Sequence, residues 1–194
     1  MSQFLESIKL FQGEVFHLDW HQKRVDETFA AKFRGAQSLN LKTILENQSL
    51  PKEDLFKIRI VYDAQAYLIE VLPYQKRNIK TVEFIETKAD YSYKSTNRSF
   101  IYKARTKSKA DEVIFIKNGY IADSSYANLV FYDGQVWFTP TTYLLNGTTR
   151  QRLISEDKIK AIPILLEDIT KFEYIGFINA LNDLGEQAIP LNGL

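Results

Sequence analysis

The stretch Asp111–Pro140 constrains the fold more than any other part of the chain, because it combines apolar runs with hairpin signals. It contains three short apolar runs, at residues 113–116, 129–132 and 136–138. The dipeptides Asn118-Gly119 and Asp133-Gly134 follow the pattern of tight hairpin turns, whose central residues need positive φ angles. The stretch therefore predicts successive β-hairpins.

Between the two hairpins lies the segment 123–128, Asp-Ser-Ser-Tyr-Ala-Asn, which we expect to be a loop because it is too polar and small for a core strand. A loop of small polar residues with one carboxylate, held between rigid strands, is suited to binding a ligand. An ordinary surface connection would have the same composition. This segment alone does not decide between the two interpretations.

Composition excludes several classes of function. The chain has 194 residues, 45% of them hydrophobic, and a net charge of +1, which gives no electrostatic reason to expect a nucleic-acid partner. Cysteine is absent and only two histidines occur, so we expect no disulfide, no cysteine nucleophile and no metal site. The N-terminus lacks a secretory pattern and no apolar run approaches the ~20 residues of a membrane span, which favours a cytoplasmic protein with no membrane partner.

We expect a mixed α/β chain of two small domains, residues 1–86 and 87–194, joined near the polar, aperiodic segment 86–93. The first should contain a hairpin, a helix with Asp19 at its N-cap, a short helical region and three strands. The expected bounds are 4–10 and 14–17 for the hairpin, 20–33 and 35–55 for the helical regions, and 57–62, 66–72 and 80–85 for the strands.

The second domain should contain the hairpins and two helices. One helix is expected at about 97–107, capped by Ser95 or Thr96, and the other at about 149–156. Strands are expected at 161–166 and 174–178, with a helical or turn segment at 168–172 between them.

Four positions suit chemistry. Gly147-Thr148-Thr149-Arg150 could bind phosphate, since the first N–H groups of a helix lack helical partners and a glycine lets a ligand approach; a plain capped helix start has the same pattern. Arg24 could clamp a phosphate, Lys94 could be a nucleophilic amine, and Asp123 could hold a protonated ring nitrogen. Each of these three also has an ordinary meaning, as a solvated charge or a turn cap.

In chain order, four motifs together resemble the fold-type IV, or class IV, pyridoxal-phosphate enzymes. The motifs are His21-Gln22-Lys23-Arg24, the segment 93–98 (Tyr-Lys-Ser-Thr-Asn-Arg), the stretch 118–128 and Gly147-Thr148-Thr149-Arg150. The family includes branched-chain aminotransferases, D-amino-acid aminotransferases and 4-amino-4-deoxychorismate lyase. The resemblance covers nearly the whole chain and implies two small α/β domains of the D-amino-acid aminotransferase type with pyridoxal 5′-phosphate between them, and a homodimer.

The resemblance also implies residue roles. Lys94 would form the Schiff base with the cofactor and shuttle the proton, and Asp123 would face the pyridine nitrogen. Arg24, Thr148 and Thr149 would hold the phosphate. The substrate side would be lined by Arg98, Asn179 and Ala180; Arg59 and Lys103 are alternative partners for a substrate carboxylate.

Lys103 also follows a tyrosine, but Lys94 stands farther before Asp123 and begins the pattern K-x-x-N-R, which ends at Arg98 and resembles the lyase more than the aminotransferases. The resemblance therefore implies conversion of 4-amino-4-deoxychorismate to 4-aminobenzoate and pyruvate, a step of folate biosynthesis. One alternative is a class IV aminotransferase acting on branched-chain or D-amino acids.

A further alternative is a non-catalytic, truncated relative that acts as a binding protein. Two departures from the family pattern motivate it. The chain begins directly at Phe4-Leu5-Glu6 without the family's upstream hairpin, and Asp123 stands where the family usually has glutamate.

Overall fold

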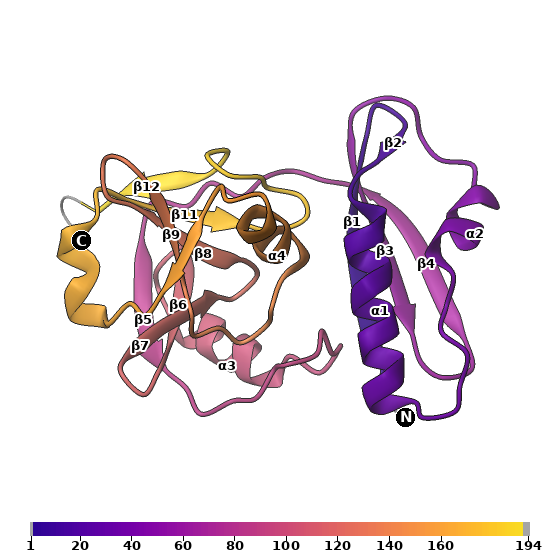
Figure 1. Ribbon diagram of the computed structural model, residues 1–194, viewed down its shortest axis with the longest axis horizontal. Helices are drawn as coiled ribbons and strands as arrows, with labels where there is room; N and C mark the ends of the chain where they lie inside the picture. Colours follow the sequence, from indigo (N-terminus) through magenta and orange to yellow (C-terminus); the bar gives the residue numbers. More distant parts are fainter. Residues whose placement is uncertain (1, 192–194) are drawn as a thin grey trace. The chain divides into compact units, whose positions relative to one another are not determined.

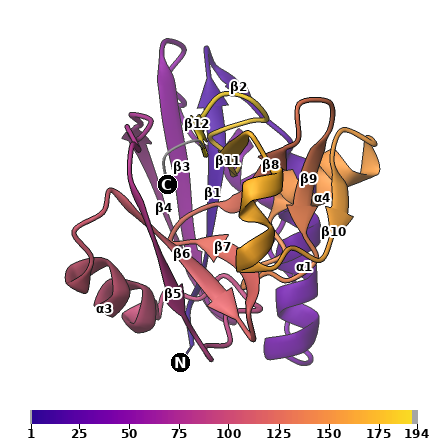
Figure 2. The ribbon, with the colours of Figure 1, turned by 90° about the vertical axis from the view of Figure 1, so that its left-hand side faces the viewer.

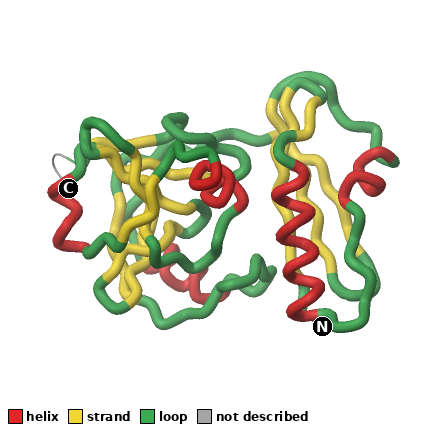
Figure 3. The backbone as a smooth tube through the Cα atoms, in the orientation of Figure 1, coloured by secondary structure: helices red, strands yellow, loops and turns green. Residues whose placement is uncertain are grey.

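The computed structural model describes residues 2–191. The chain forms two compact units: residues 1–76 with 93–97, and residues 77–92 with 98–194 (Figure 1). Strands form the framework of each unit, and the helices are few (Figure 3). The chain is thus mixed α/β, as the sequence predicted.

The first unit is an antiparallel sheet with two helices. Its strands are β1 (Phe4–Phe11), β2 (Glu14–Val15), β3 (Leu55–Tyr62) and β4 (Tyr67–Pro73), in the order β2-β1-β3-β4; its helices are α1 (Leu18–Lys32) and α2 (Leu41–Glu46). Alternate side chains of β1 are buried, as the period of a strand requires. They share a core with β3 and both helices through residues such as Ile8, Val25, Leu41 and Ile58.

Helix α1 begins two residues earlier than the sequence predicted, at Leu18 instead of Trp20. Asp19 is not its N-cap, so that prediction is wrong. His17 occupies the N-cap in a left-handed conformation with φ 54°, and Asp19 lies in the first turn. A carboxylate there still favours the helix, because it faces the positive end of the helix dipole.

The second unit contains eight strands arranged around β8 (Asn128–Tyr132), which pairs with β7, β9 and β11. The other strands are β5 (Val82–Glu86), β6 (Glu112–Lys117), β7 (Tyr120–Ser124), β9 (Trp137–Pro140), β10 (Lys160–Ile162), β11 (Tyr174–Ile178) and β12 (Ala188–Pro190). The helices are α3 (Ser99–Lys107), α4 (Thr148–Ser155) and the 3₁₀ helix η1 (Leu166–Lys171). The predicted hairpins are confirmed as β6–β7 and β8–β9.

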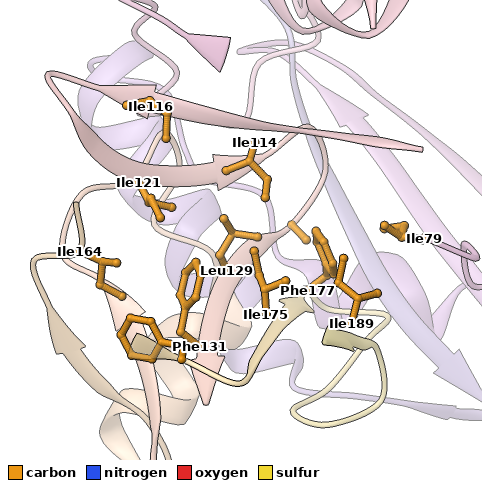
Figure 4. Close-up of a cluster of buried hydrophobic side chains, with 12 residues drawn as sticks. Ile79, Ile114, Ile116, Ile121, Leu129, Phe131, Ile164, Ile175, Phe177 and Ile189 are labelled. Carbon is orange, nitrogen blue, oxygen red and sulfur yellow. The ribbon is translucent and has the colours of Figure 1, made fainter. Parts of the chain in front are cut away.

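The main core of this unit lies among β6, β8 and β11, where Ile114, Leu129, Phe131, Ile175 and Phe177 pack together (Figure 4). Helix α3 lies beside β6, and α4 packs against β8 and β11 through other apolar side chains (Figure 2).

The sequence predicted a domain boundary between residues 86 and 87, but two segments belong to the opposite unit. Strand β5 pairs in parallel with β6 of the second unit. Residues 93–97 join the first unit, where Ser95 bridges to Phe4 and Thr96 N–H donates to Gln3 O. Neither Ser95 nor Thr96 caps α3, whose N-cap is Arg98. Long-range backbone pairing, rather than local composition, assigns these segments.

Candidate active site

The predicted loop 123–128 is shorter than expected, because only residues 125–127 lie outside strands, and most of the segment is buried. Strand β7 runs through Asp123 and Ser124, β8 begins at Asn128, and Asp123 pairs with Asn128 across the hairpin. Ser124 closes the turn, because its N–H donates to Ala127 O at 2.9 Å. These polar residues are tolerated in the interior because their groups are hydrogen-bonded.

The Asp123 carboxylate, 5% exposed, organises the surrounding chain. Its Oδ1 accepts from Asn128 Nδ2 at 2.7 Å, and its Oδ2 accepts from the N–H groups of Leu144 and Leu145, both at 2.8 Å. Burial raises the pKa of Asp123 to about 6 and outweighs these hydrogen bonds, which lower it. A carboxylate has about four acceptor positions. Donors from the described residues occupy three of these positions on Asp123, which leaves one acceptor position for a cationic donor.

Asn128 joins this turn to the start of α4. Its Nδ2 also donates to Leu145 O at 2.8 Å. A Cβ atom at Gly147 would lie 2.0 Å from Asn128 Oδ1. The φ of Gly147 is −66°, which any residue can adopt, so glycine is needed here for close approach and not for backbone freedom.

Helix α4 begins directly after Gly147, with Thr148 and Thr149 buried in its first turn. Gly147 has no side chain to cap the helix, so the first N–H groups depend on other partners. These N–H groups, the hydroxyls of Thr148 and Thr149 and the positive end of the helix dipole make the N-terminus of α4 suited to binding an anion. The predicted phosphate-binding turn therefore has the backbone form that the chemistry needs.

Arg150 fixes the loop that leads into α4. Its Nη1 donates to Asn146 Oδ1 at 3.0 Å, its Nη2 donates to Pro140 O at 2.9 Å, and its guanidinium lies over the Tyr143 ring at 4.7 Å. Asp123 holds the middle of the same loop through Leu144 and Leu145. The loop is therefore fixed from both sides.

In the first unit, Arg24 and His21 meet a glutamate that the sequence analysis missed. Arg24 Nε donates to Glu6 Oε1 at 2.8 Å and Arg24 Nη2 to Glu6 Oε2 at 2.5 Å, while His21 Nδ1 lies 2.6 Å from Glu6 Oε2. The alternation of β1 was the available signal, since Glu6 occupies the same face as Phe4 and Ile8.

These three side chains form a charge-balanced buried group. Burial alone would raise the pKa of Glu6, but the Arg24 charge and the hydrogen bonds from His21 and Arg24 hold that pKa at about 2. Burial lowers the pKa of His21, so its neutral ring donates Nδ1–H to Glu6. Arg24 thus has a fixed orientation, as a phosphate ligand requires.

Lys94 lies beside β1, the strand that carries Glu6. It is half-buried, and its backbone oxygen accepts from Leu5 N–H at 2.9 Å. Its positive charge contributes to the lowered pKa of His21. Lys103, the other candidate lysine, is exposed on α3.

The remaining predicted residues have structural partners. Arg98 Nη2 donates to Ser125 O, and Arg59 pairs with Glu70. Asn179 Oδ1 accepts from Leu181 N–H at 2.8 Å, and Ala180, in the same turn, is half-buried. The first unit thus carries Arg24 and Lys94. The second carries Asp123, Thr148, Thr149, Arg98, Asn179 and Ala180.

Within residues 2–191, no group of three or more His, Cys, Asp or Glu side chains could hold a metal ion. Over the same residues, the helices are too short or too polar to cross a membrane.

Comparisons with known proteins identify similar chains. The family model described as amino-transferase class IV matches residues 3–185. An uncharacterised protein of Haemophilus influenzae is 32% identical over 188 residues, which are 95% of this chain and 100% of that protein.

Solved structures are also similar. A proposed 4-amino-4-deoxychorismate lyase from Haemophilus somnus is 30% identical with a TM-score of 0.89, and the match covers 95% of this chain and 98% of that one. An aminotransferase from Brucella abortus bound to pyridoxal phosphate has a TM-score of 0.69 at 18% identity, covering 97% of this chain and 79% of that one. At that identity the second likeness concerns the fold alone.

Proposed function

Because this chain belongs to the class IV aminotransferase family of pyridoxal 5′-phosphate-dependent enzymes, we propose that it is a lyase converting 4-amino-4-deoxychorismate to 4-aminobenzoate and pyruvate. The observation that carries the proposal is the match, over almost the full length of both chains, to the proposed lyase of Haemophilus somnus. The pattern Lys94-x-x-Asn97-Arg98 supports the same reaction.

The residues of each unit fit the cofactor. Asp123 keeps an acceptor position for a protonated ring nitrogen, and the start of α4 suits a phosphate. Arg24 donates two N–H groups to Glu6, and this bidentate pair fixes the orientation of its guanidinium. When bound, the cofactor supplies an electron sink at the substrate carbon that bears the amine.

The side chains would divide the work as follows. Lys94 would hold the cofactor covalently through Nζ and, once displaced by the substrate amine, would take the proton from the amine-bearing carbon. Loss of that proton lets the substrate break its bond to the enolpyruvyl oxygen, and the ring becomes aromatic. Asp123, with a pKa of about 6, would be mostly ionised at pH 7, and a cation beside it would lower that pKa further.

The test is incubation of the purified protein with 4-amino-4-deoxychorismate and measurement of 4-aminobenzoate release. Lys94→Ala should abolish release, whereas Lys103→Ala, at an exposed lysine of α3, should keep it. Reduction with borohydride followed by peptide mapping should place the modified lysine at position 94.

Two outcomes would change the proposal. Brisk transfer of an amino group to 2-oxoglutarate without release of 4-aminobenzoate would identify an aminotransferase for branched-chain or D-amino acids. A colourless protein that takes up no pyridoxal phosphate would contradict a catalytic role and favour a binding protein.

We also propose a cytoplasmic homodimer, as the family resemblance implies. Light scattering after size-exclusion chromatography should then give twice the chain mass of 22.5 kDa. A mass of one chain at micromolar concentration would contradict the dimer.

A further inference from the structure

Two charged side chains hold the backbone of Ser125, at the centre of the turn that carries Asp123. Ser125 N–H donates to Glu112 Oε1 at 3.0 Å and also to Val113 O at 3.2 Å, and Ser125 O accepts from Arg98 Nη2. No sequence motif marks Glu112, and the family resemblance places Arg98 on the substrate side.

Glu112 is a fully buried carboxylate at the start of β6. Its Oε1 also accepts from Val113 N–H at 3.0 Å, and its Oε2 accepts from Arg77 Nη1 at 2.8 Å. Arg77 in turn lies over the Tyr126 ring at 4.3 Å. Burying a carboxylate costs several kcal/mol unless it is paired and hydrogen-bonded. Glu112 has such partners from three segments, at Arg77, Val113 and Ser125, and we ask what these contacts do for the turn.

Glu112 is not needed to close the turn. Ser124 already closes it through its N–H bond to Ala127 O at 2.9 Å and its Oγ, which accepts from Ala127 N–H at 3.1 Å. Glu112 adds a side-chain bond to β6 beside the backbone bond from Ser125 N–H to Val113 O, and Arg98 connects the turn to the start of α3. They therefore fix where the closed turn lies, and with it the direction of Asp123, two residues from Ser125.

We propose that Glu112 and Arg98 are positioning residues that hold the Asp123 carboxylate in its cofactor-facing place through the backbone of Ser125. The inference rests on the proposed function, because it concerns the contact between Asp123 and the ring nitrogen. Charge-assisted hydrogen bonds suit this role, since they are stronger and shorter than neutral ones.

The test is a double-mutant cycle on pyridoxal phosphate affinity, titrated by absorbance into the apo protein. Glu112→Gln should weaken affinity about 10-fold when Asp123 is present and less than about 2-fold in an Asp123→Asn background, because the two act through one contact. Glu156→Gln is the matched control: this carboxylate also pairs with an arginine, Arg152, but at the far end of α4, and should change affinity in neither background.

A loss of equal size in both backgrounds would overturn the positioning role, since it would show an effect independent of Asp123. Arg98→Met provides a second, independent cycle with the same expected outcome should Glu112→Gln fail to fold.

Amide exchange gives a reading that needs no cofactor. Without pyridoxal phosphate, the Ser125 amide should exchange at least several-fold faster in Glu112→Ala than in the wild type, although its N–H keeps the 3.2 Å bond to Val113 O, and unchanged exchange would refute the inference. A wild type that binds no pyridoxal phosphate would instead refute the proposed function, while the exchange data would still decide whether Glu112 fixes the turn.

Discussion

Replacing Asp123 with asparagine should remove a pH dependence of stability that burial of this carboxylate creates. Burial raises its pKa from 3.8 to about 6 in the folded protein. A carboxyl with a raised folded pKa binds its proton more tightly when folded. The folded state therefore loses stability as pH rises through the interval between the two values, and the loss levels off at about pH 7.

The size of the effect follows from the shift. About two pKa units correspond to roughly 3 kcal/mol, of which about 2–2.5 kcal/mol should appear between pH 4 and pH 7. Asparagine cannot titrate. Its amide also places a donor against the N–H groups of Leu144 and Leu145 or against Asn128, which costs about 1–3 kcal/mol at every pH. That offset leaves the pH dependence of the difference unchanged.

The assay is urea unfolding of the apo proteins at pH 4, 5, 6 and 7. The advantage of the wild type over Asp123→Asn should be largest at pH 4 and should shrink by about 2 kcal/mol or more by pH 7. Asp133→Asn is the control. The backbone hydrogen bonds of Asp133 lower its pKa, so its contribution should change with pH in the opposite direction. A difference for Asp123 that stays flat, or grows with pH, would refute the reasoning.

Three further variants test the rest of the site. Glu6→Gln should lower the free energy of unfolding by roughly 3–5 kcal/mol at pH 7, because it breaks a buried ion pair. Since the pKa of Glu6 is held at about 2, the advantage of the wild type in urea unfolding should fade between pH 4.5 and pH 2. A difference that stays constant over this range would contradict the prediction. Gly147→Ala should lower stability by about 1–3 kcal/mol in thermal unfolding, since its Cβ would lie 2.0 Å from Asn128 Oδ1. The same change should cost less in an Asn128→Ala background, and an unchanged melting temperature would rule out the close approach. Thr149→Val should weaken binding of pyridoxal phosphate several-fold but leave binding of pyridoxal unchanged, and equal losses for both ligands would argue against a phosphate contact.

The sequence by itself determined the elements whose signals are local. The dipeptides Asn118-Gly119 and Asp133-Gly134 predicted the hairpins that the structure contains, because positive φ at such turns is a property of a few residues. His21 and Arg24 were placed correctly on one side of a helix, because helical spacing alone sets that relation.

Tertiary structure decided which polar groups are buried together. Composition marked 123–128 as a loop, yet Asp123 and Asn128 are strand residues, because partners at Leu144, Leu145 and Gly147 satisfy or accommodate them. Those partners lie far along the chain, and no local pattern specifies them.

The same holds for the two buried glutamates. Glu6 meets Arg24 across 18 positions, and Glu112 meets Arg77 across 35 and Ser125 across 13. A carboxylate is stable in the interior only where the folded chain brings donors to it, so its role becomes readable only once those donors are in place.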